Sequence, residues 1–285
     1  SPASSMLLLS EPNCSRRCSG DQLMRTERTH RFQLVGVIHL LPLPGSPRAR
    51  AFAEVHERAL RDAEAYARGG VDLLLVENFG DAPFPKERVP PHVIAGMALI
   101  VDAVQRATGL PTGVNVLRND AQAALGIAAM TGSRFIRVNV HVGAMLTDQG
   151  IIEGRADETL RYRRILDAPV EIWADILVKH AVPLAPLTLE DVARDTVERG
   201  LADALILTGP ATGKPPSVAD VAKVREAVPG VRLFIGSGLT AENVGTYLGC
   251  ADGAIVGTWT KVGGIIANPV DERRVRQLVQ AIGRA

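Results

Sequence analysis

The sequence predicts a closed (β/α)8 barrel, in which eight parallel strands alternate with helices. Short apolar runs alternate eight times with segments of helical periodicity, and each unit takes roughly 30 residues, as in such barrels. The runs are continuously apolar, which is typical of strands covered on both faces. The last two runs break into Gly and hydroxyl residues, as do the loops that hold a phosphate after strands seven and eight of many barrels.

Each expected strand is rich in Val, Ile and Leu and ends at Gly, Pro or a polar residue. The strands are expected at 34–39, 71–76, 112–117, 135–140, 170–176, 204–207, 232–235 and 254–256. The helices are expected at 51–68, 90–108, 121–130, 156–166, 188–200, 217–228, from about 240, and at 271–282. An open doubly wound sheet shares this alternation, but no Gly-x-Gly-x-x-Gly follows the first strand, so a closed barrel is favoured.

The length fits one barrel domain with an N-terminal extension. The chain has 285 residues, and a barrel of this kind needs about 250. We therefore expect a disordered extension at 1–31 and a single barrel domain at 32–285. Arg and Ser residues give the extension a faint similarity to a transit peptide, but Glu11, Asp21 and Glu27 argue against one.

Charge, cysteine content and hydropathy argue against several classes of partner. The net charge of +1 gives no electrostatic case for nucleic acid. No apolar run reaches the ~18 residues of a membrane helix. Three cysteines do not make a disulfide framework. These features predict a cytoplasmic protein with a small-molecule partner, and they leave homo-oligomerisation open.

Polar side chains gather where the expected strands end, which is the mouth at which barrel enzymes carry their chemistry. The opposite strand ends look bland by comparison, with Gly70, Pro111, Pro169 and Gly230. The polar residues at the mouth are His39, Glu77, Asn78, Asp81, Asn115, Arg118, Asn119, Asp120, Asn139, His141, Asp175, Lys179, His180 and Thr208. This asymmetry predicts a polar pocket at one end of the barrel.

Two amides in this set stand inside β-branched runs. A buried amide costs about 1–3 kcal/mol unless it is hydrogen-bonded. Asn115 and Asn139 therefore bind either a ligand or neighbouring strand-end groups.

Asp175 and Lys179 are candidate acid–base residues. If their strand continues, they point to the same side about 13 Å apart, so they would act at different depths. A lysine in a dry pocket can be a base or a Schiff-base nucleophile, and the alternative is a surface lysine on the loop.

The histidines allow acid–base or metal chemistry. His39 and His141 are candidates for proton transfer, and with Glu77 and Asp175 either could hold a divalent cation. No His-x-His or His-Glu-x-x-His spacing is present, so we assign no metal ligands and leave the cofactor open.

Two long breaks between elements resemble binding loops. The first, 147–155, ends in Arg155, which could close on a phosphate or carboxylate. The second, 208–216, starts at Thr208 and lacks a P-loop ending. The alternative for both is a solvated loop.

The phosphate site is expected at the last two strand ends. Gly236, Ser237 and Gly238 follow strand seven, and Gly257 and Thr258 follow strand eight. Glycine allows close backbone approach, and a following helix would offer free N–H groups and a positive dipole end.

Several long strings in the chain are similar to those of the BtpA/SgcQ family. They are VGVIHLLPLPGSP, VENFGD, GVNVLRND, RVNVHVGAMLTDQGIIEGRA, VKHAVPL, TGPATGKPP and IGSGLTAENV. The resemblance spans about residues 34–282 and implies a barrel of the ribulose-phosphate-binding type. It also implies either sugar metabolism with undefined substrates or a role in photosystem I biogenesis.

The chain departs from the family pattern at four positions. Leu177 stands where a His is usual, Ser217 where an Asp is usual, and Trp259 and Gly263 where a Ser and an Asp are usual. The loss of the His puts any reaction that depends on it in doubt.

Three functions remain after this resemblance. The first is an isomerase, lyase or hydrolase acting on a phosphorylated sugar or nucleotide-like compound. In it Asp175, Lys179, His141 and Glu77 would be catalytic. The substrate would lie on His39, Asn78, Asn115, Asn139, Arg155, His180 and Thr208. The second is a non-catalytic photosystem I biogenesis factor, and the third is a barrel that binds a phosphorylated ligand without turnover.

Overall fold

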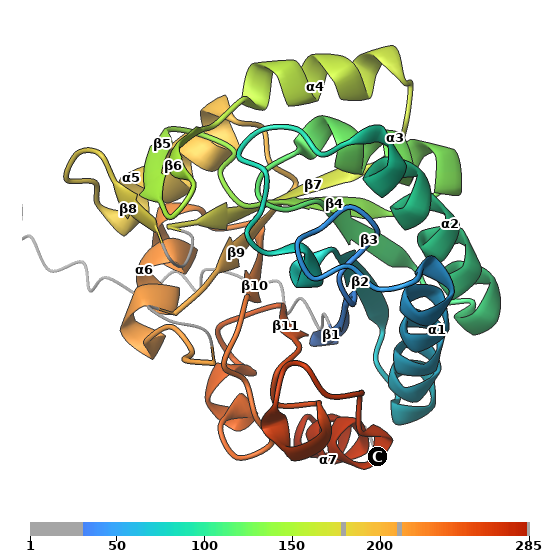
Figure 1. Cartoon of the computed structure of the whole chain (residues 1–285). Helices are drawn as coiled ribbons and strands as arrows, with labels where there is room; N and C mark the ends of the chain where they lie inside the picture. Colours follow the sequence, from blue (N-terminus) through green and yellow to red (C-terminus); the bar gives the residue numbers. More distant parts are fainter. Residues whose placement is uncertain (1–30, 178–180, 210–212, 284–285) are drawn as a thin grey trace, which may run out of the picture. The chain divides into compact units, whose positions relative to one another are not determined.

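The structure is a computed structural model that describes residues 31–177, 181–209 and 213–283. Eight parallel strands close into a barrel in the order β1-β11-β10-β9-β7-β4-β3-β2 (Figure 1). They are β1 (Gln33–His39), β2 (Leu73–Glu77), β3 (Thr112–Asn115), β4 (Phe135–Val138), β7 (Glu171–Ile176), β9 (Ala204–Leu207), β10 (Arg232–Ile235) and β11 (Gly253–Val256). The predicted (β/α)8 barrel is confirmed, and every expected strand overlaps an observed one.

Helices cover the outside of this barrel. They are α1 (Phe52–Gly69), α2 (Pro91–Thr108), α3 (Ala121–Thr131), α4 (Ala156–Ile165), α5 (Leu189–Arg194), which continues as a π-helical turn (Asp195–Arg199), α6 (Val218–Ala227) and α7 (Glu272–Ala281). The side chains of Asp120, Thr188 and Ser217 each accept a hydrogen bond from the backbone N–H three residues on. These caps satisfy N–H groups that a helix start leaves unpaired.

The helix expected from about residue 240 is absent from the described structure. The Asn243 side chain accepts a hydrogen bond from the N–H of Thr240 (2.9 Å) and donates one to the carbonyl of Gly238 (3.0 Å), which holds a turn. Only a 3-10 helix, Val244–Tyr247, follows. Gly245 within it disfavours a longer helix.

A small antiparallel sheet occupies part of the long break at 147–155 that the sequence analysis assigned to a binding loop or a solvated loop. It consists of β5 (Ala144–Thr147), β6 (Gly150–Glu153) and β8 (Ala181–Pro183). β5 and β6 form a hairpin whose turn ends at Gly150, where φ is +92°. Met145 and Ile152 on one face pack against Val140, so the hairpin is fixed to the barrel.

Aromatic side chains fill the barrel interior. The rings of Phe135 and Trp173 stack with centroids 3.8 Å apart, and those of Trp173 and Phe234 with centroids 4.2 Å apart. A Cβ at Gly113 would collide with the ring of Phe135, so this strand needs glycine there. The interior is therefore a packed core below the mouth.

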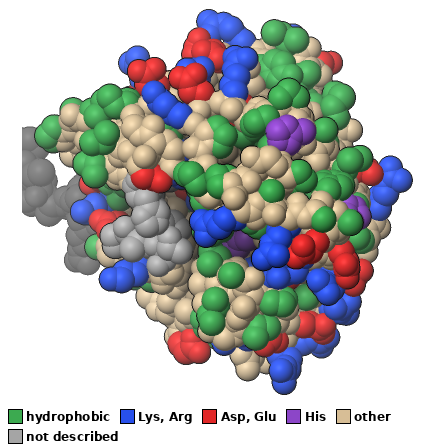
Figure 2. Space-filling model, in the orientation of Figure 1, with side chains coloured by type: hydrophobic (Ala, Val, Ile, Leu, Met, Phe, Trp, Pro, Cys, Tyr) green, Lys and Arg blue, Asp and Glu red, His purple; other side chains and the backbone are tan. Residues whose placement is uncertain are grey.

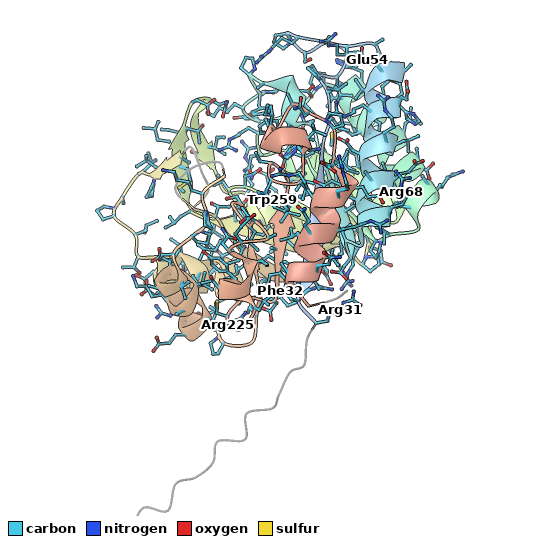
Figure 3. All side chains as sticks on the ribbon, turned by 90° about the horizontal axis from the view of Figure 1, so that it is seen from below. Arg31, Phe32, Glu54, Arg68, Arg225 and Trp259 are labelled. Atoms are coloured by element: carbon cyan, nitrogen blue, oxygen red, sulfur yellow. The ribbon has the colours of Figure 1, made fainter. Side chains whose placement is uncertain are left out.

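Ion pairs tie the outer helices together. Arg68 lies on α1 (Figure 3). It donates a hydrogen bond of 2.8 Å to Glu272 at the start of α7. Basic and acidic side chains are interspersed over the face that Figure 2 shows, and the net charge of the chain is +1. In the ranges that the structure describes, no helix is long and apolar enough to cross a membrane.

The aromatic stack gives a stability prediction. Trp173→Ala should lower the free energy of unfolding by about 3–5 kcal/mol, because it leaves a cavity in the barrel centre. Urea unfolding measures this, with Ile165→Ala as the control because Ile165 is 77% exposed. Equal unfolding midpoints for the two variants would contradict the stack's role as the core.

Candidate functional site

A cavity of about 610 Å³ opens where the barrel strands end. Its size is that of small-molecule sites, which span about 300–1,000 Å³. Eight of the predicted site residues line it: His39, Glu77, Asn139, Gly236, Ser237, Gly238, Gly257 and Thr258. Apolar side chains complete the wall, among them Phe79, Phe84, Leu117, Leu239, Ile255, Trp259 and Ile266.

A buried ion pair between neighbouring strands organises one side of the cavity. Nε and Nη2 of Arg137 on β4 donate to the two carboxylate oxygens of Asp175 on β7, each at 3.0 Å. The Asp175 side chain is fully buried, and that of Arg137 is 8% exposed. Burial by itself would lower the pKa of Arg137, but the charges of Asp175 and Glu77 outweigh it and raise the pKa.

Asn139 takes a fixed orientation from the same carboxylate. Its Nδ2 donates to Oδ2 of Asp175 at 2.8 Å, so its Oδ1 must point the other way. This Oδ1 is buried and has no hydrogen-bond partner among the described residues. Because Asn139 lines the cavity, the oxygen is a ready acceptor for a ligand hydroxyl or amine.

Glu77 presents the carboxylate that lines the cavity. The register pairs His39, Glu77 and Asn115 across β1, β2 and β3. Asn115 donates to Oε2 of Glu77 at 2.6 Å, and Nη1 of Arg137 lies 3.9 Å from the same oxygen. Nε2 of His39 lies 3.8 Å from Oε1, so a histidine and a carboxylate meet at the mouth.

The glycine loops form another part of the wall. Gly238 has φ of +76°, and a Cβ at Gly257 would collide with the His39 ring. A Cβ at Gly236 would lie 2.5 Å from the Thr208 methyl. No α-helix starts at these loops, so the helix dipole expected there is missing and only the backbone N–H groups and the hydroxyls of Ser237 and Thr258 remain.

A second buried ion pair anchors the loop after β11. Lys261 and Asp62 are at most 1% exposed, with Nζ and Oδ2 3.0 Å apart. The other Asp62 oxygen accepts from the N–H of Val270 at 2.8 Å, and the Tyr66 hydroxyl lies 2.7 Å from Oγ1 of Thr260. Burial lowers the pKa of Lys261 and the Asp62 charge opposes this, so the pair fixes the loop onto α1.

Other predicted residues support the backbone. Oδ1 of Asn78 accepts from the N–H of Leu117 at 2.7 Å, and its Nδ2 donates to Asp81 at 3.1 Å. Nε2 of His141 lies 2.7 Å from the carbonyl oxygen of Gly200. Asn78 and His141 thus hold loops in place, and neither lines the cavity.

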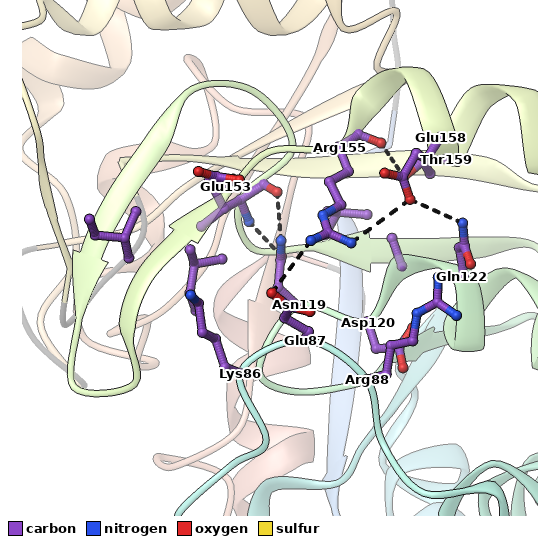
Figure 4. A pocket seen from close by; sticks show the side chains of 15 residues that line it. Lys86, Glu87, Arg88, Asn119, Asp120, Gln122, Glu153, Arg155, Glu158 and Thr159 are labelled. Carbon is purple, nitrogen blue, oxygen red and sulfur yellow. Dashed lines mark hydrogen bonds and ion pairs between the residues drawn. The ribbon is translucent and has the colours of Figure 1, made fainter.

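Arg155 lies away from this cavity. It lines a smaller cavity of about 100 Å³ between α4 and the preceding loops (Figure 4). Its guanidinium is 3.5 Å from a Glu87 oxygen and 3.9 Å from a Glu158 oxygen. The mouth and Arg155 are therefore separate features.

Thr208 and Leu177 are not among the residues that line the cavity. Thr208 is buried at the end of β9, and its Oγ1 has no partner in the described part of the chain. Lys179 and His180 lie outside the described residues. Leu177 has φ of +52° and packs against Met145 of the small sheet and its neighbours.

Two arginines of the cavity carried no predicted role. Arg137 stands inside an apolar run and Arg118 follows β3, and both line the cavity. A charged residue within an otherwise apolar strand is a signal that could have identified Arg137, because an unpaired buried charge is rarely tolerated. The described residues contain no group of three or more His, Cys, Asp or Glu side chains placed to hold a metal ion.

Fold and site together define a (β/α)8 barrel with a small-molecule cavity at its C-terminal mouth. The sequence model of the BtpA family matches residues 30–284. The chain therefore belongs to the BtpA family.

Two relatives show how far the similarity extends. The chain is 50% identical over 261 residues to the photosystem I biogenesis protein BtpA of Synechocystis, which covers 91% of each chain. It is 47% identical over 248 residues to an uncharacterized protein of Pyrococcus furiosus, covering 87% of this chain and 93% of that one.

Solved structures share the fold at low identity. Tryptophan synthase of Mycobacterium tuberculosis matches with a TM-score of 0.59 and 16% identity, covering 89% of this chain and 93% of that chain. N-(5'-phosphoribosyl)anthranilate isomerase of Pyrococcus furiosus matches with a TM-score of 0.54 and 13% identity, covering 89% and 100%. These likenesses establish the barrel fold alone.

The central ion pair predicts a large loss of stability. Asp175→Asn should lower the free energy of unfolding by about 3–5 kcal/mol, because Arg137 then stays buried without its counter-charge. The control is Asp157→Asn, which removes a carboxylate that is 70% exposed in its pair with Arg161 and should cost at most about 1 kcal/mol. Equal losses in urea unfolding would contradict the assignment.

His141 predicts a pH dependence of stability. Burial lowers its pKa in the folded protein, so below the unfolded value of about 6.5 the unfolded chain binds the proton more readily. Stability should therefore fall between pH 7.5 and 5, by up to about 1.4 kcal/mol per pH unit from this residue. His141→Gln should flatten that decline in urea unfolding.

His92→Gln on α2 is the control for that series, because His92 is exposed. It should keep the decline of the unmodified protein. A decline that is unchanged in His141→Gln would show that this histidine is not the group responsible.

Proposed function

We propose that the cavity binds a phosphorylated sugar or nucleotide-like compound and catalyses an isomerase, lyase or hydrolase reaction on it. The observation that carries this proposal is one cavity of about 610 Å³ whose wall contains both the two glycine loops and the carboxylate–histidine pair of Glu77 and His39. The loops supply an anion site, and Glu77 with His39 supplies proton transfer. Membership of the BtpA family and the fold shared with a phosphoribosyl-substrate isomerase support it.

The phosphate would lie on the loops after β10 and β11. Successive backbone N–H groups in turns form concave anion sites, and glycine lets the backbone approach closely. In this proposal the N–H groups of Gly238 and Gly257 and the hydroxyls of Ser237 and Thr258 hold the phosphate oxygens, while the N–H of Gly236 donates to the carbonyl of Leu207 at 2.8 Å. Thr208, beside Gly236, supports this wall.

Proton transfer would take place on the other side of the cavity. Glu77 accepts a proton from the substrate, and His39, 3.8 Å away, donates or relays one. Arg137 and the fixed Oδ1 of Asn139 orient the substrate. Asp175 is committed to Arg137 and Asn139, so it acts as a positioning residue.

Other predicted residues keep more distant roles in this proposal. Asn115 holds Glu77, and Asn78 and His141 hold backbone segments in place. Arg155 pairs with Glu87 beside the smaller cavity. Lys179 stays a candidate base or nucleophile, and His180 a candidate substrate ligand. A cytoplasmic location, a homo-oligomer and a divalent metal also remain open.

A non-catalytic role in photosystem I biogenesis is the alternative. It rests on the name of the Synechocystis relative and on 50% identity over 91% of each chain. Photosystem I content after deletion of the gene in its organism of origin would separate the two functions. A loss of photosystem I that an inactive Glu77→Gln protein restores would favour the non-catalytic role.

The phosphate site predicts a charge effect on ligand binding. A sugar phosphate at one hundred times its Kd should raise the melting temperature by roughly 5–10 °C. Ser237→Asp should abolish that rise, because its carboxylate repels the phosphate. Thermal unfolding with a panel of sugar monophosphates measures the effect.

Thr246→Asp is the matched control, because Thr246 is exposed on the 3-10 helix that follows this loop and does not line the cavity. It should respond to ligand like the unmodified protein. A panel in which no compound raises the melting temperature of the unmodified protein would overturn the proposal.

A further inference from the structure

One side of the cavity wall is built from aromatic and aliphatic side chains. Phe79 and Phe84 follow β2, and Trp259 follows β11. β2 and β11 are the two neighbours of β1 in the closed barrel, so these side chains come from adjoining segments of the mouth. Leu239 after β10 and Ile266 after β11 continue the same wall.

Contacts through the His39 ring join these segments into one surface. The ring of Phe79 meets that of His39 edge to face, with centroids 4.9 Å apart. A Cβ at Gly257 would collide with the same His39 ring, and Trp259 is only two residues further along that loop. The aromatic wall therefore begins directly beside the loop proposed to hold the phosphate.

The Trp259 side chain is held in place from outside the cavity. The guanidinium carbon of Arg274 on α7 lies 4.6 Å from the centroid of the Trp259 ring, and its Nε donates to the Trp259 carbonyl. A cation over an aromatic ring is an attractive contact, so the indole is fixed without a ligand. Because Trp259 is half-buried and lines the cavity, part of the indole is left for a ligand to contact.

Polar partners for a sugar lie across the mouth from this wall. Arg137 and Asn139 belong to β4 and the residues after it, and β4 is four strands from β11 in the closed order. A sugar hydroxyl turned toward β4 meets these side chains. A hydroxyl turned toward Phe79 or Phe84 would lose its water, and a phenyl ring offers it no comparable partner. The wall therefore suits a flat apolar group of the ligand.

We propose that the phosphorylated ligand carries an aromatic ring, either a nucleobase or an aryl group, which stacks on Trp259 and contacts Phe79 and Phe84. This inference rests on the proposed phosphate site and narrows its substrate class. Aromatic rings pack in offset-stacked or edge-to-face arrangements, and an indole beside two phenyl rings provides surfaces for both. Trp259 is then a specificity-determining residue of the cavity.

The test compares two sets of phosphate monoesters by calorimetry. AMP, GMP, CMP and UMP are each compared with ribose 5-phosphate, which has the sugar and the phosphate without a base. Phenyl phosphate is compared with cyclohexyl phosphate, whose saturated ring is similar in size. In at least one set the aromatic compound should bind more tightly, by about tenfold for a nucleotide or about threefold for phenyl phosphate. The set that shows the preference identifies the ring as a nucleobase or an aryl group.

Variants then assign the preference to Trp259. Trp259→Leu keeps an apolar side chain and should reduce the preference to within about twofold, because stacking is lost. Trp259→Phe keeps an aromatic face and should retain part of it. Phe79→Leu should weaken the preference independently, and it serves if the Leu variant of Trp259 folds poorly. Phe52→Leu is the control and should keep all of it, because Phe52 is a half-buried ring on α1 that does not line the cavity.

The outcomes separate this inference from the phosphate site. If ribose 5-phosphate or cyclohexyl phosphate binds as tightly as its aromatic counterparts in both sets, the aromatic site is overturned and the phosphate site stands. A preference that survives both Trp259→Leu and Phe79→Leu also overturns it. Absence of binding by every probe counts against the phosphate site itself, and the inference then falls with it.

Discussion

The bidentate pair between Arg137 and Asp175 is the interaction on which the mouth of this barrel depends. Side chains alternate along a strand, so Phe135 and Arg137 on β4 point inward in successive layers, as do Trp173 and Asp175 on β7. The aromatic rings form the lower layer and the ion pair forms the layer above it. The two charges are thus buried above a layer of aromatic rings, and a buried charge must be paired.

The pairing of Arg137 with Asp175 determines which polar groups face the cavity. Asp175 uses its oxygens on Arg137 and Asn139, so it is withdrawn from the reacting groups and the Asn139 oxygen is turned outward. Oε2 of Glu77 lies 3.9 Å from Nη1 of Arg137, and Oε1 of Glu77 lies 3.8 Å from Nε2 of His39. Glu77 and Asp175 both stand at the ends of barrel strands. Because Asp175 is bound to Arg137 and Asn139, Glu77 is the carboxylate that remains for the proposed chemistry.

The sequence predicts the barrel well because each strand is covered on both faces. Continuous apolar runs of four to seven residues are a strong signal, and the glycine, proline and capping residues between them mark the turns. The small sheet was missed because its strands are short and only half covered. The helix near Thr240 was wrongly expected because the side-chain bonds of Asn243 compete with helical ones.

The sequence predicts that the site lies at the mouth of the barrel, but it does not predict the contacts of each site residue. Strand ends locate polar residues, but they do not say which carbonyl or carboxylate each one meets. His141 follows β4, yet its ring reaches the carbonyl of Gly200 outside the cavity. Arg155 pairs with Glu87 in the loop before α2 and with Glu158 on α4. The sequence analysis missed Arg137 because its apolar neighbours made the run at 135–140 resemble a strand of the hydrophobic core.

The two buried ion pairs hold different walls of the cavity, and these walls differ in charge. Asp62 and Lys261 lie outside the barrel and hold the loop after β11, so they fix the charge-free wall without lending it charge. Arg137 and Asp175 lie inside and fix the charged wall. The two walls of the cavity therefore differ in charge. Under the proposed function, a ligand bound with its ends reversed would lose either the glycine N–H groups or Arg137, so Glu77 and His39 would meet the substrate in one orientation.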